Sequence, residues 1–364
     1  MPEYTIRDIA KMAGVSVGTV SRILNHADNV SEDIRSRTLD IIAKVNYQAA
    51  PRGRRTAQSS GVVKVAANHK VLRRNIALLL PGVTREWMHN QLWMAYLSGI
   101  ESAMHSRNGR LTIFTADCNP DEVAGEIIGR AEGVLLKVQS PVPEYVREIM
   151  SHLPVVGFGI EKMSSPIPQV VIDNNFGGVI ATEKLLELGH TQIAFVNHEN
   201  RNYPFIARSN GYVEVMKKHG LFDPAYLFEL PGKDRNLAIT PEKTPPNLDS
   251  IVEAMQQLKV FPTAAVVAND WGAFGLMRSC EKYGIKIPQD LSIIGMDTSG
   301  NLCDILQPAL SSVEMPFAQA AEFAAHTLMD ILDHVGSYKE NTASVMNIPG
   351  KLILRDSVNE LIHK

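Results

Sequence analysis

Residues 5 to 47 constrain the fold of this chain more than any other segment, because they show the pattern of two short helices joined by a tight turn. The apolar residues with helical spacing before the turn are Ile6, Ile9, Ala10 and Ala13. They predict a first helix with one buried face. Gly14 then supplies the backbone freedom that the turn requires, and Val15 can cap the small core.

The residues after Gly14 predict a second helix with a polar outer surface. Ser16 is a good N-cap, and Val20, Ile23 and Leu24 are spaced to face inward. The residues left on or near the outer surface are Val17, Gly18, Thr19, Ser21, Arg22 and Asn25. These short side chains and one long cation suit close approach to base edges and phosphates in the major groove of DNA.

A third helix is expected after Ser31, which is a suitable N-cap for it. The alternative interpretation of this region is a small helical bundle with no special purpose. The turn glycine, the small Ala10 and the polar outward face occur together, and this combination favours a helix-turn-helix motif.

From Thr5 to Asn25 the chain resembles the lactose/galactose repressor (LacI/GalR) family of bacterial transcriptional regulators. The family pattern Thr-Ile-x-Asp-Val-Ala-x-x-Ala-Gly-Val-Ser-x-x-Thr-Val-Ser-Arg-Val-Leu-Asn is matched with only Val-to-Ile exchanges. The resemblance implies a DNA-binding domain over residues 1–50, with Thr5 and Ser16 among the residues that contact DNA. It also implies that Val17 and Gly18 set base choice, while Thr19 and Arg22 contact phosphates or a guanine.

The charges of the chain are unevenly distributed. Residues 1–75 hold 13 Lys and Arg against 6 Asp and Glu, a balance of +7, whereas the remainder holds 23 against 33, a balance of −10. A basic first segment can dock on phosphates while an acidic body avoids them. An anionic membrane could also attract the basic segment, but nothing in it has the apolar face of an interfacial helix.

The sequence also bears on compartment and cofactors. It has no apolar run of membrane-spanning length and no signal peptide at its start, so a cytoplasmic protein is expected. Cys118, Cys280 and Cys303 are far apart and show no metal-ligand spacing, so we expect buried reduced thiols. No metal site and no cofactor are predicted.

Residues 51–74 are predicted to form a basic linker without sustained helical or strand periodicity. In the family, a short hinge helix here inserts a leucine into the minor groove. This chain departs from that pattern, because Gly53 weakens any helix and no leucine lies between Tyr47 and Leu72. The arginines of this segment are Arg52, Arg54 and Arg55. Entry of these arginines into a narrow minor groove and a merely solvated linker both remain open.

Residues 75–364 alternate short apolar strands with amphipathic helices, which predicts an α/β fold with parallel sheets covered on both faces. The resemblance to the family continues here and implies two Rossmann-like lobes, as in periplasmic binding proteins. The expected lobes are residues 75–172 with 308–338, and residues 173–307 with 339–364. An effector is expected in the cleft between them.

The resemblance assigns five residues to that effector: Asn90, Trp93, Arg208, Asn269 and Asp297. Each has a structural alternative. Instead of binding the effector, Arg208 could pair with a cleft carboxylate. Asn269 and Asp297 could cap the turns that follow their strands, and Trp93 could belong to the core.

Other classes of function are less consistent with the sequence. The best dinucleotide-binding match, Gly157-Phe-Gly159-Ile-Glu-Lys162, lacks the third glycine, and no nucleophile elbow or phosphate loop is present, so an enzyme is not expected. A transport-type solute-binding protein would need a signal peptide. We therefore expect a homodimeric repressor that binds a palindromic operator and responds allosterically to a sugar. A nucleoside, a sugar phosphate or a partner protein is the alternative effector.

Overall fold

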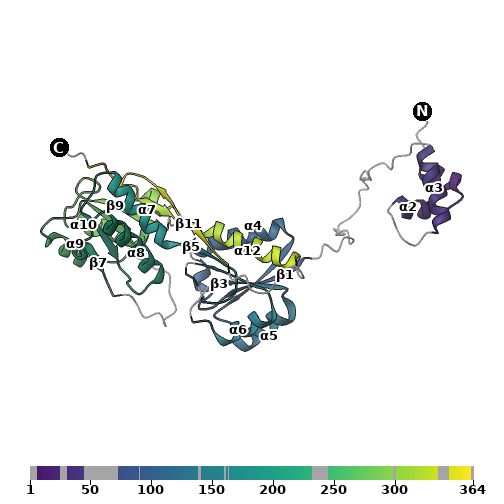
Figure 1. Ribbon diagram of the computed structural model, residues 1–364, viewed down its shortest axis with the longest axis horizontal. Coiled ribbons are helices and arrows are strands. Elements are labelled where there is room, and N and C mark those ends of the chain that lie inside the picture. Colours follow the sequence, from purple (N-terminus) through teal and green to yellow (C-terminus); the bar gives the residue numbers. More distant parts are fainter. Residues whose placement is uncertain are drawn as a thin grey trace, which may run out of the picture. The chain divides into compact units, whose positions relative to one another are not determined.

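A computed structural model describes residues 6–24, 31–44, 73–89, 91–137, 141–159, 161–162, 164–231, 245–297, 301–334 and 344–361 of the chain (Figure 1). The chain divides into two compact units, Met1–His69 and Lys70–Lys364. None of the described helices combines the length and the apolar character that crossing a bilayer requires.

The first unit contains the helices α1 (Ile6–Ala13), α2 (Val17–Leu24) and α3 (Glu32–Lys44). Gly14 has a φ of 66° between α1 and α2, which is the left-handed conformation that the predicted turn requires. The core of the unit is small: Ile9, Ala10 and Val20 form a buried cluster, against which Val15 and two isoleucines of α3 pack. The predicted helix-turn-helix arrangement is therefore present in the described residues.

The second unit is built on two sheets, and we call the parts around them lobe 1 and lobe 2. Within the described ranges, the lobe 1 sheet has six strands in the order β11-β5-β4-β3-β1-β2. These strands are β1 (Arg74–Leu80), β2 (Gly109–Thr115), β3 (Gly133–Lys137), β4 (Val155–Gly159), β5 (Gln169–Asp173) and β11 (Val345–Pro349). The neighbouring strands of this sheet pair in parallel.

Helices cover both faces of the lobe 1 sheet. Figure 1 shows α4 and α12 on one face and α5 and α6 on the other. The helical segments of lobe 1 are η1 (Glu86–His89), α4 (Gln91–Ser106), α5 (Pro120–Arg130), α6 (Glu144–His152) and α12 (Phe317–Asp333). Gly99 lets α4 and α12 approach closely, because a Cβ there would lie 1.9 Å from the Ala318 carbonyl oxygen.

The described strands of lobe 2 also form a six-stranded sheet, in the order β12-β10-β9-β8-β6-β7. They are β6 (Ile193–Asn197), β7 (Leu227–Glu229), β8 (Ala264–Val267), β9 (Ser292–Asp297), β10 (Ser311–Glu314) and β12 (Lys351–Ile353). Only the pairing of β10 with β12 is antiparallel among those described. The helical segments are α7 (Asn174–Glu187), α8 (Tyr203–Lys218), η2 (Pro224–Tyr226), α9 (Asp249–Gln256), α10 (Asp270–Lys282) and α11 (Leu302–Ile305).

The chain passes between the lobes at the carboxyl ends of strands. β5 ends at Asp173 and α7 begins at the next residue; two residues separate the end of β10 from the start of α12; and β11 leads through Gly350 into β12. Because β5 is parallel to its lobe 1 neighbours and β10 is parallel to β9, the carboxyl ends of both sheets face these crossings. Side chains at the strand ends of one lobe therefore lie toward the other lobe.

The strand pairing corrects two of the lobe boundaries expected from the sequence. Ser311–Glu314 was expected in lobe 1, but it pairs with β9 in the lobe 2 sheet. Val345–Pro349 was expected in lobe 2, but it pairs with β5 in the lobe 1 sheet. The boundaries expected from the sequence put the two crossings before β10 and before β11. In the structure the chain passes to the other lobe after each of these strands.

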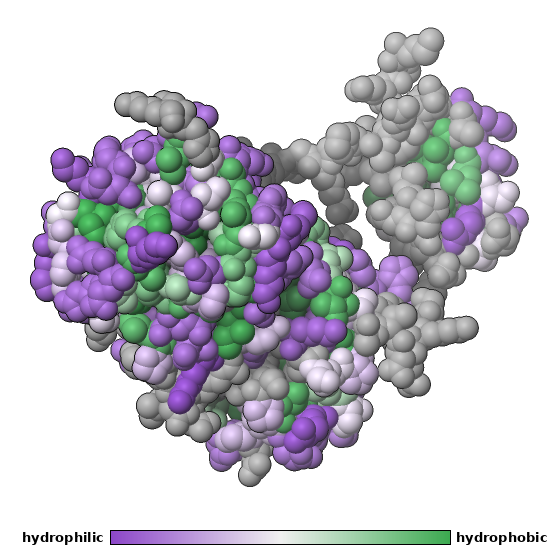
Figure 2. Space-filling view, turned by 60° about the vertical axis from the view of Figure 1, so that its left-hand side comes forward, coloured by the Kyte–Doolittle hydropathy of each residue, from purple (hydrophilic) through white to green (hydrophobic). Residues whose placement is uncertain are grey.

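The surface and the thiols of the second unit are as expected for a packed α/β protein. Figure 2 shows hydrophilic side chains spread over the visible face of this unit, with hydrophobic patches between them. Cys280 and Cys303 are buried and Cys118 is partly buried, and all three are free thiols. Burial raises the pKa of Cys280 to about 12, so this thiol is a poor nucleophile.

Candidate functional site

Ser16 caps the start of α2, the helix whose outer surface is predicted to contact DNA. The Ser16 Oγ accepts a hydrogen bond from the Thr19 backbone N–H at 3.1 Å and lies 2.9 Å from the Thr19 Oγ1. Ser16 is therefore the N-cap that the sequence predicted. Val17, at 41% exposed, and Gly18 present an apolar side chain and open backbone beside it.

Several predicted DNA-contacting groups lie outside the described residues. These are Thr5, Asn25, Arg52, Arg54 and Arg55, together with the side chains of Ser21 and Arg22. The backbone of Ser21 and Arg22 belongs to α2. Arg74 was counted in the basic linker, but it is the first residue of β1 and forms ion pairs with Glu132 and Asp333.

Arg208 on α8 is the centre of the candidate site in lobe 2. Its side chain is 2% exposed and donates hydrogen bonds to three acceptors from different elements. The Nε donates to the Asn174 Oδ1 at 3.0 Å, the Nη1 to the Ala268 carbonyl oxygen at 2.6 Å, and the Nη2 to the Asp297 Oδ1 at 2.6 Å. This arrangement fixes the guanidinium group where α7, β8 and β9 meet.

Close packing of α7 against α8 positions Arg208. A Cβ on Gly178 would lie 2.0 Å from the Arg208 carbonyl oxygen, and one on Gly211 would lie 2.1 Å from the Asn175 carbonyl oxygen. The two glycines therefore let the helix backbones touch. Asn174, the first residue of α7, is thereby within hydrogen-bond reach of Arg208.

Asn269 and Asp297 lie at the carboxyl ends of neighbouring strands, as predicted. The Asn269 Oδ1 accepts a hydrogen bond from the Gly272 N–H at 2.7 Å and so caps α10. Asp297 has a φ of 108°, which is strained for a residue with a side chain, and its carboxylate is 19% exposed beside Arg208. Capping thus occupies one Asn269 atom, whereas Asp297 keeps a partly open carboxylate.

Trp93 lies in an aromatic cluster of lobe 1 and is buried there. The indole is 2% exposed, and its ring centroid lies 5.4 Å from that of Tyr96. Tyr96 in turn contacts Phe158 and Phe317 edge to face. The predicted effector residue Asn90, just before α4, lies outside the described residues.

Tyr96 lies near the candidate site, and the sequence analysis did not name it. Burial raises the pKa of its phenol well above the usual range, the Asp297 carboxylate raises it further, and Arg208 lowers it. This lobe 1 side chain is therefore close enough to Arg208 and Asp297 of lobe 2 for both charges to act on its phenol. Helical spacing alone marks Tyr96 as a core residue of α4, so no sequence signal distinguished it.

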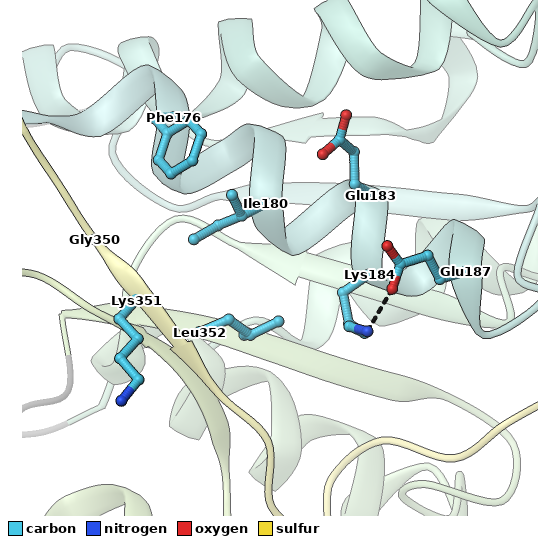
Figure 3. A pocket seen from close by; sticks show the side chains of 8 residues that line it. All are labelled: Phe176, Ile180, Glu183, Lys184, Glu187, Gly350, Lys351 and Leu352. Carbon is cyan, nitrogen blue, oxygen red and sulfur yellow. Dashed lines mark hydrogen bonds and ion pairs between the residues drawn. The ribbon is translucent and has the colours of Figure 1, made fainter.

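Two grooves lie near the crossings between the lobes. One groove, of about 180 Å³, is lined by residues that include Asp173, Asn174 and Tyr203. Its Asn174 is the residue that accepts a hydrogen bond from Arg208. The other, of about 360 Å³, lies between α7 and β12 and contains none of the predicted effector residues. Figure 3 shows Lys184 in this second groove reaching toward Glu187.

Comparisons with known proteins give a family match in each of the two units. Residues 5–49 match the family described as bacterial regulatory proteins, lacI family, and residues 182–358 match the periplasmic binding protein-like domain. Catabolite control protein A of Priestia megaterium is 26% identical, over 97% of this chain and 98% of its own. The transcriptional repressor PurR of Vibrio vulnificus (strain CMCP6) is 24% identical, over 98% and 99%.

The chain thus carries a lacI-family domain at residues 5–49 and resembles LacI-family regulators over nearly its whole length.

The solved structures agree with this assignment in fold. The regulator CelR in complex with cellobiose has a TM-score of 0.60 at 23% identity, with 97% of this chain and 99% of that chain covered. A ribose-bound LacI-family regulator from Enterococcus faecium has a TM-score of 0.61 at 23% identity, covering 79% of this chain and 100% of its own. The lacI-family match at residues 5–49 and the regulators among the relatives support a DNA-binding transcriptional regulator and not an enzyme.

Proposed function

We propose that this LacI-family protein is a homodimeric repressor, that it binds a palindromic operator, and that a carbohydrate between its lobes changes that binding. The observation that carries the proposal is the fixed Arg208–Asp297 pair at the carboxyl edge of the lobe 2 sheet. A guanidinium beside a partly open carboxylate offers donors and acceptors to neighbouring hydroxyl groups. The sugar-bound states named for CelR and the Enterococcus faecium regulator support this class of effector.

The DNA contacts are assigned to the outer surface of α2. Val17 offers a methyl-sized apolar contact for a thymine, and Gly18 lets the helix sit close to the bases. Thr19 and Arg22 are assigned to phosphates or a guanine, together with Ser21 and Asn25. The arginines at positions 52, 54 and 55 are assigned to the minor groove.

The regulation follows from linkage between two ligands of one protein. A dimer places two α2 helices on two half-sites about one helical turn apart. The effector changes operator affinity only through its differential affinity for two arrangements of the lobes. The family resemblance also assigns Trp93, Asn269 and Asn90 to the effector, as it does Arg208 and Asp297.

The test is fluorescence anisotropy of the purified full chain on the DNA upstream of its own gene, across a salt series and with neutral and acidic sugars. We expect specific binding that weakens steeply with salt and changes at least tenfold with one sugar, which is about 1.4 kcal/mol of coupling. A Gly18→Glu variant places an anion against the DNA, and we expect it to lose operator binding. A matched Gly125→Glu variant on α5 should bind normally, because open space surrounds Gly125. The proposal fails if specific and unrelated DNA bind equally at every salt concentration.

A further inference from the structure

Lys137 stands at the carboxyl end of β3, on the edge of the lobe 1 sheet that faces lobe 2. It is partly buried, and no ion pair joins it to any residue within the described ranges. Burial lowers the pKa of its ammonium group and Glu161 raises it, so that carboxylate is near without forming an ion pair. A partly desolvated ammonium group without a partner is costly, and a counter-ion would offset that cost.

Three buried polar groups around the same edges also have no hydrogen-bond partner within the described part of the chain. They are the Trp93 Nε1, the Tyr96 Oη and the Asn197 Nδ2. Trp93 and Tyr96 belong to lobe 1, and Asn197 ends β6 in lobe 2. Each of these groups can donate a hydrogen bond, and buried donors without acceptors are rare in folded proteins.

The lysine and the aromatic donors are connected in the fold. Lys137 is the register partner of Phe158 in the pairing of β3 with β4. Phe158 packs edge to face on Tyr96, with ring centroids 5.3 Å apart, and Tyr96 packs on Trp93. The cation and two unpartnered donors thus share one contiguous part of lobe 1.

The acidic groups at these strand ends are mostly engaged or exposed. Arg208 offsets the charge of Asp297, and the Asp173 Oδ1 accepts a hydrogen bond from the Phe176 N–H at the start of α7. Glu314, at the end of β10, is exposed, and Glu161 follows β4. The Trp93, Tyr96 and Asn197 groups can donate, while these nearby carboxylates are engaged or exposed, and together these facts favour a ligand rich in acceptor oxygens.

We propose that the effector carries an anionic group, a carboxylate or a phosphate monoester on a polyhydroxylated body, and that Lys137 is its counter-ion. This inference rests on the proposed function, because it names the class of effector that the space between the lobes takes. Acceptor oxygens of the same molecule take hydrogen bonds from Tyr96, Trp93 and Asn197. The matching neutral sugar leaves the ammonium group without a counter-ion and binds more weakly.

The experiment is calorimetric titration of the full chain with matched pairs of probes. The pairs are D-glucuronate with D-glucose, D-galacturonate with D-galactose, and D-glucose 6-phosphate with D-glucose. We expect one acid to bind at least tenfold more tightly than its neutral parent, which corresponds to about 1.4 kcal/mol. Preference for a uronate or for the phosphate distinguishes a carboxylate from a phosphate monoester. Equal or tighter binding of the neutral parents, or binding of none of the acids, overturns the proposal.

Variants separate the charge from the rest of the site. Lys137→Gln should lose at least tenfold of the affinity for the acid and little of any affinity for its neutral parent, whereas Lys137→Arg should stay within a few-fold of wild type. Lys286→Gln is the control, because Lys286 is exposed and precedes β9. It therefore lies toward the amino ends of the lobe 2 strands, away from the carboxyl ends that face lobe 1. Unchanged acid affinity in Lys137→Gln contradicts the assignment.

Two further measurements keep the result interpretable. Without ligand, Lys137→Gln should melt at or above the wild-type temperature, because the substitution removes a partly buried unpaired charge. If that variant fails to fold, Tyr96→Phe tests the same site, and it should weaken binding of the acid severalfold. Operator binding that responds to a neutral sugar and not to the acids would refute the anionic effector while leaving the proposed function intact.

Discussion

Arg208 holds together three acceptors of different kinds: an amide oxygen, a backbone carbonyl and a carboxylate. Replacing it by alanine leaves the Asp297 carboxylate without its partner and two buried oxygens without their donor. We expect Arg208→Ala to lower the free energy of unfolding by about 3–5 kcal/mol, as measured by urea denaturation. The control is Arg147→Ala, which removes an exposed ion pair with Glu144 and should cost less than about 1 kcal/mol. Equal stability of the two variants would show that Arg208 does not organise the site.

At the scale of elements, the contact between α7 and α8 places Arg208 beside Asn174, β8 and β9. Gly178 permits that contact, because a Cβ there would lie 2.0 Å from a backbone oxygen that cannot move independently. We expect Gly178→Ala to destabilise the protein by about 1–3 kcal/mol or more, and to shift the helices enough to weaken effector binding. Gly125→Ala on α5 is the matched control, because nothing lies within 4 Å of its added Cβ. That substitution should be neutral or stabilising by about 0.5–1 kcal/mol, since alanine is the better helix former. Similar melting temperatures for the two variants would contradict the close helix contact.

At the scale of the whole molecule, the chain consists of two separate compact units with a boundary at residues 69 and 70. The start of β1 is fastened within the second unit, because Arg74 pairs with Glu132 and with Asp333 at the end of α12. We therefore expect residues 70–364 alone to unfold cooperatively at the melting temperature of that unit in the full chain. This fragment should also keep effector binding measured by calorimetry and lose operator binding measured by anisotropy. A fragment that is aggregated or unfolded would show that the second unit depends on the first.

Local sequence patterns were sufficient for the features that depend on near neighbours. The Gly14 turn, the Ser16 cap and the inward Ile9 and Val20 follow from spacing within a few residues, and all four are present as predicted. The long helices of the second unit were also predicted, because an amphipathic period over ten or more residues is a strong signal. The positions of Arg208 and Asp297 came from the family resemblance, and their contact came from the structure.

Tertiary structure alone decided the features that join distant parts of the chain. The short strands β10 and β11 carry no distinctive period, so their assignment to lobes depended on pairing with β9 and β5. Trp93 and Tyr96 look like ordinary apolar positions of a helix, and only the fold brings them near Lys137 and Asp297. The physical reason is that helix periodicity and capping are set by residues a few positions apart, whereas strand pairing and buried charge depend on partners tens to hundreds of residues away.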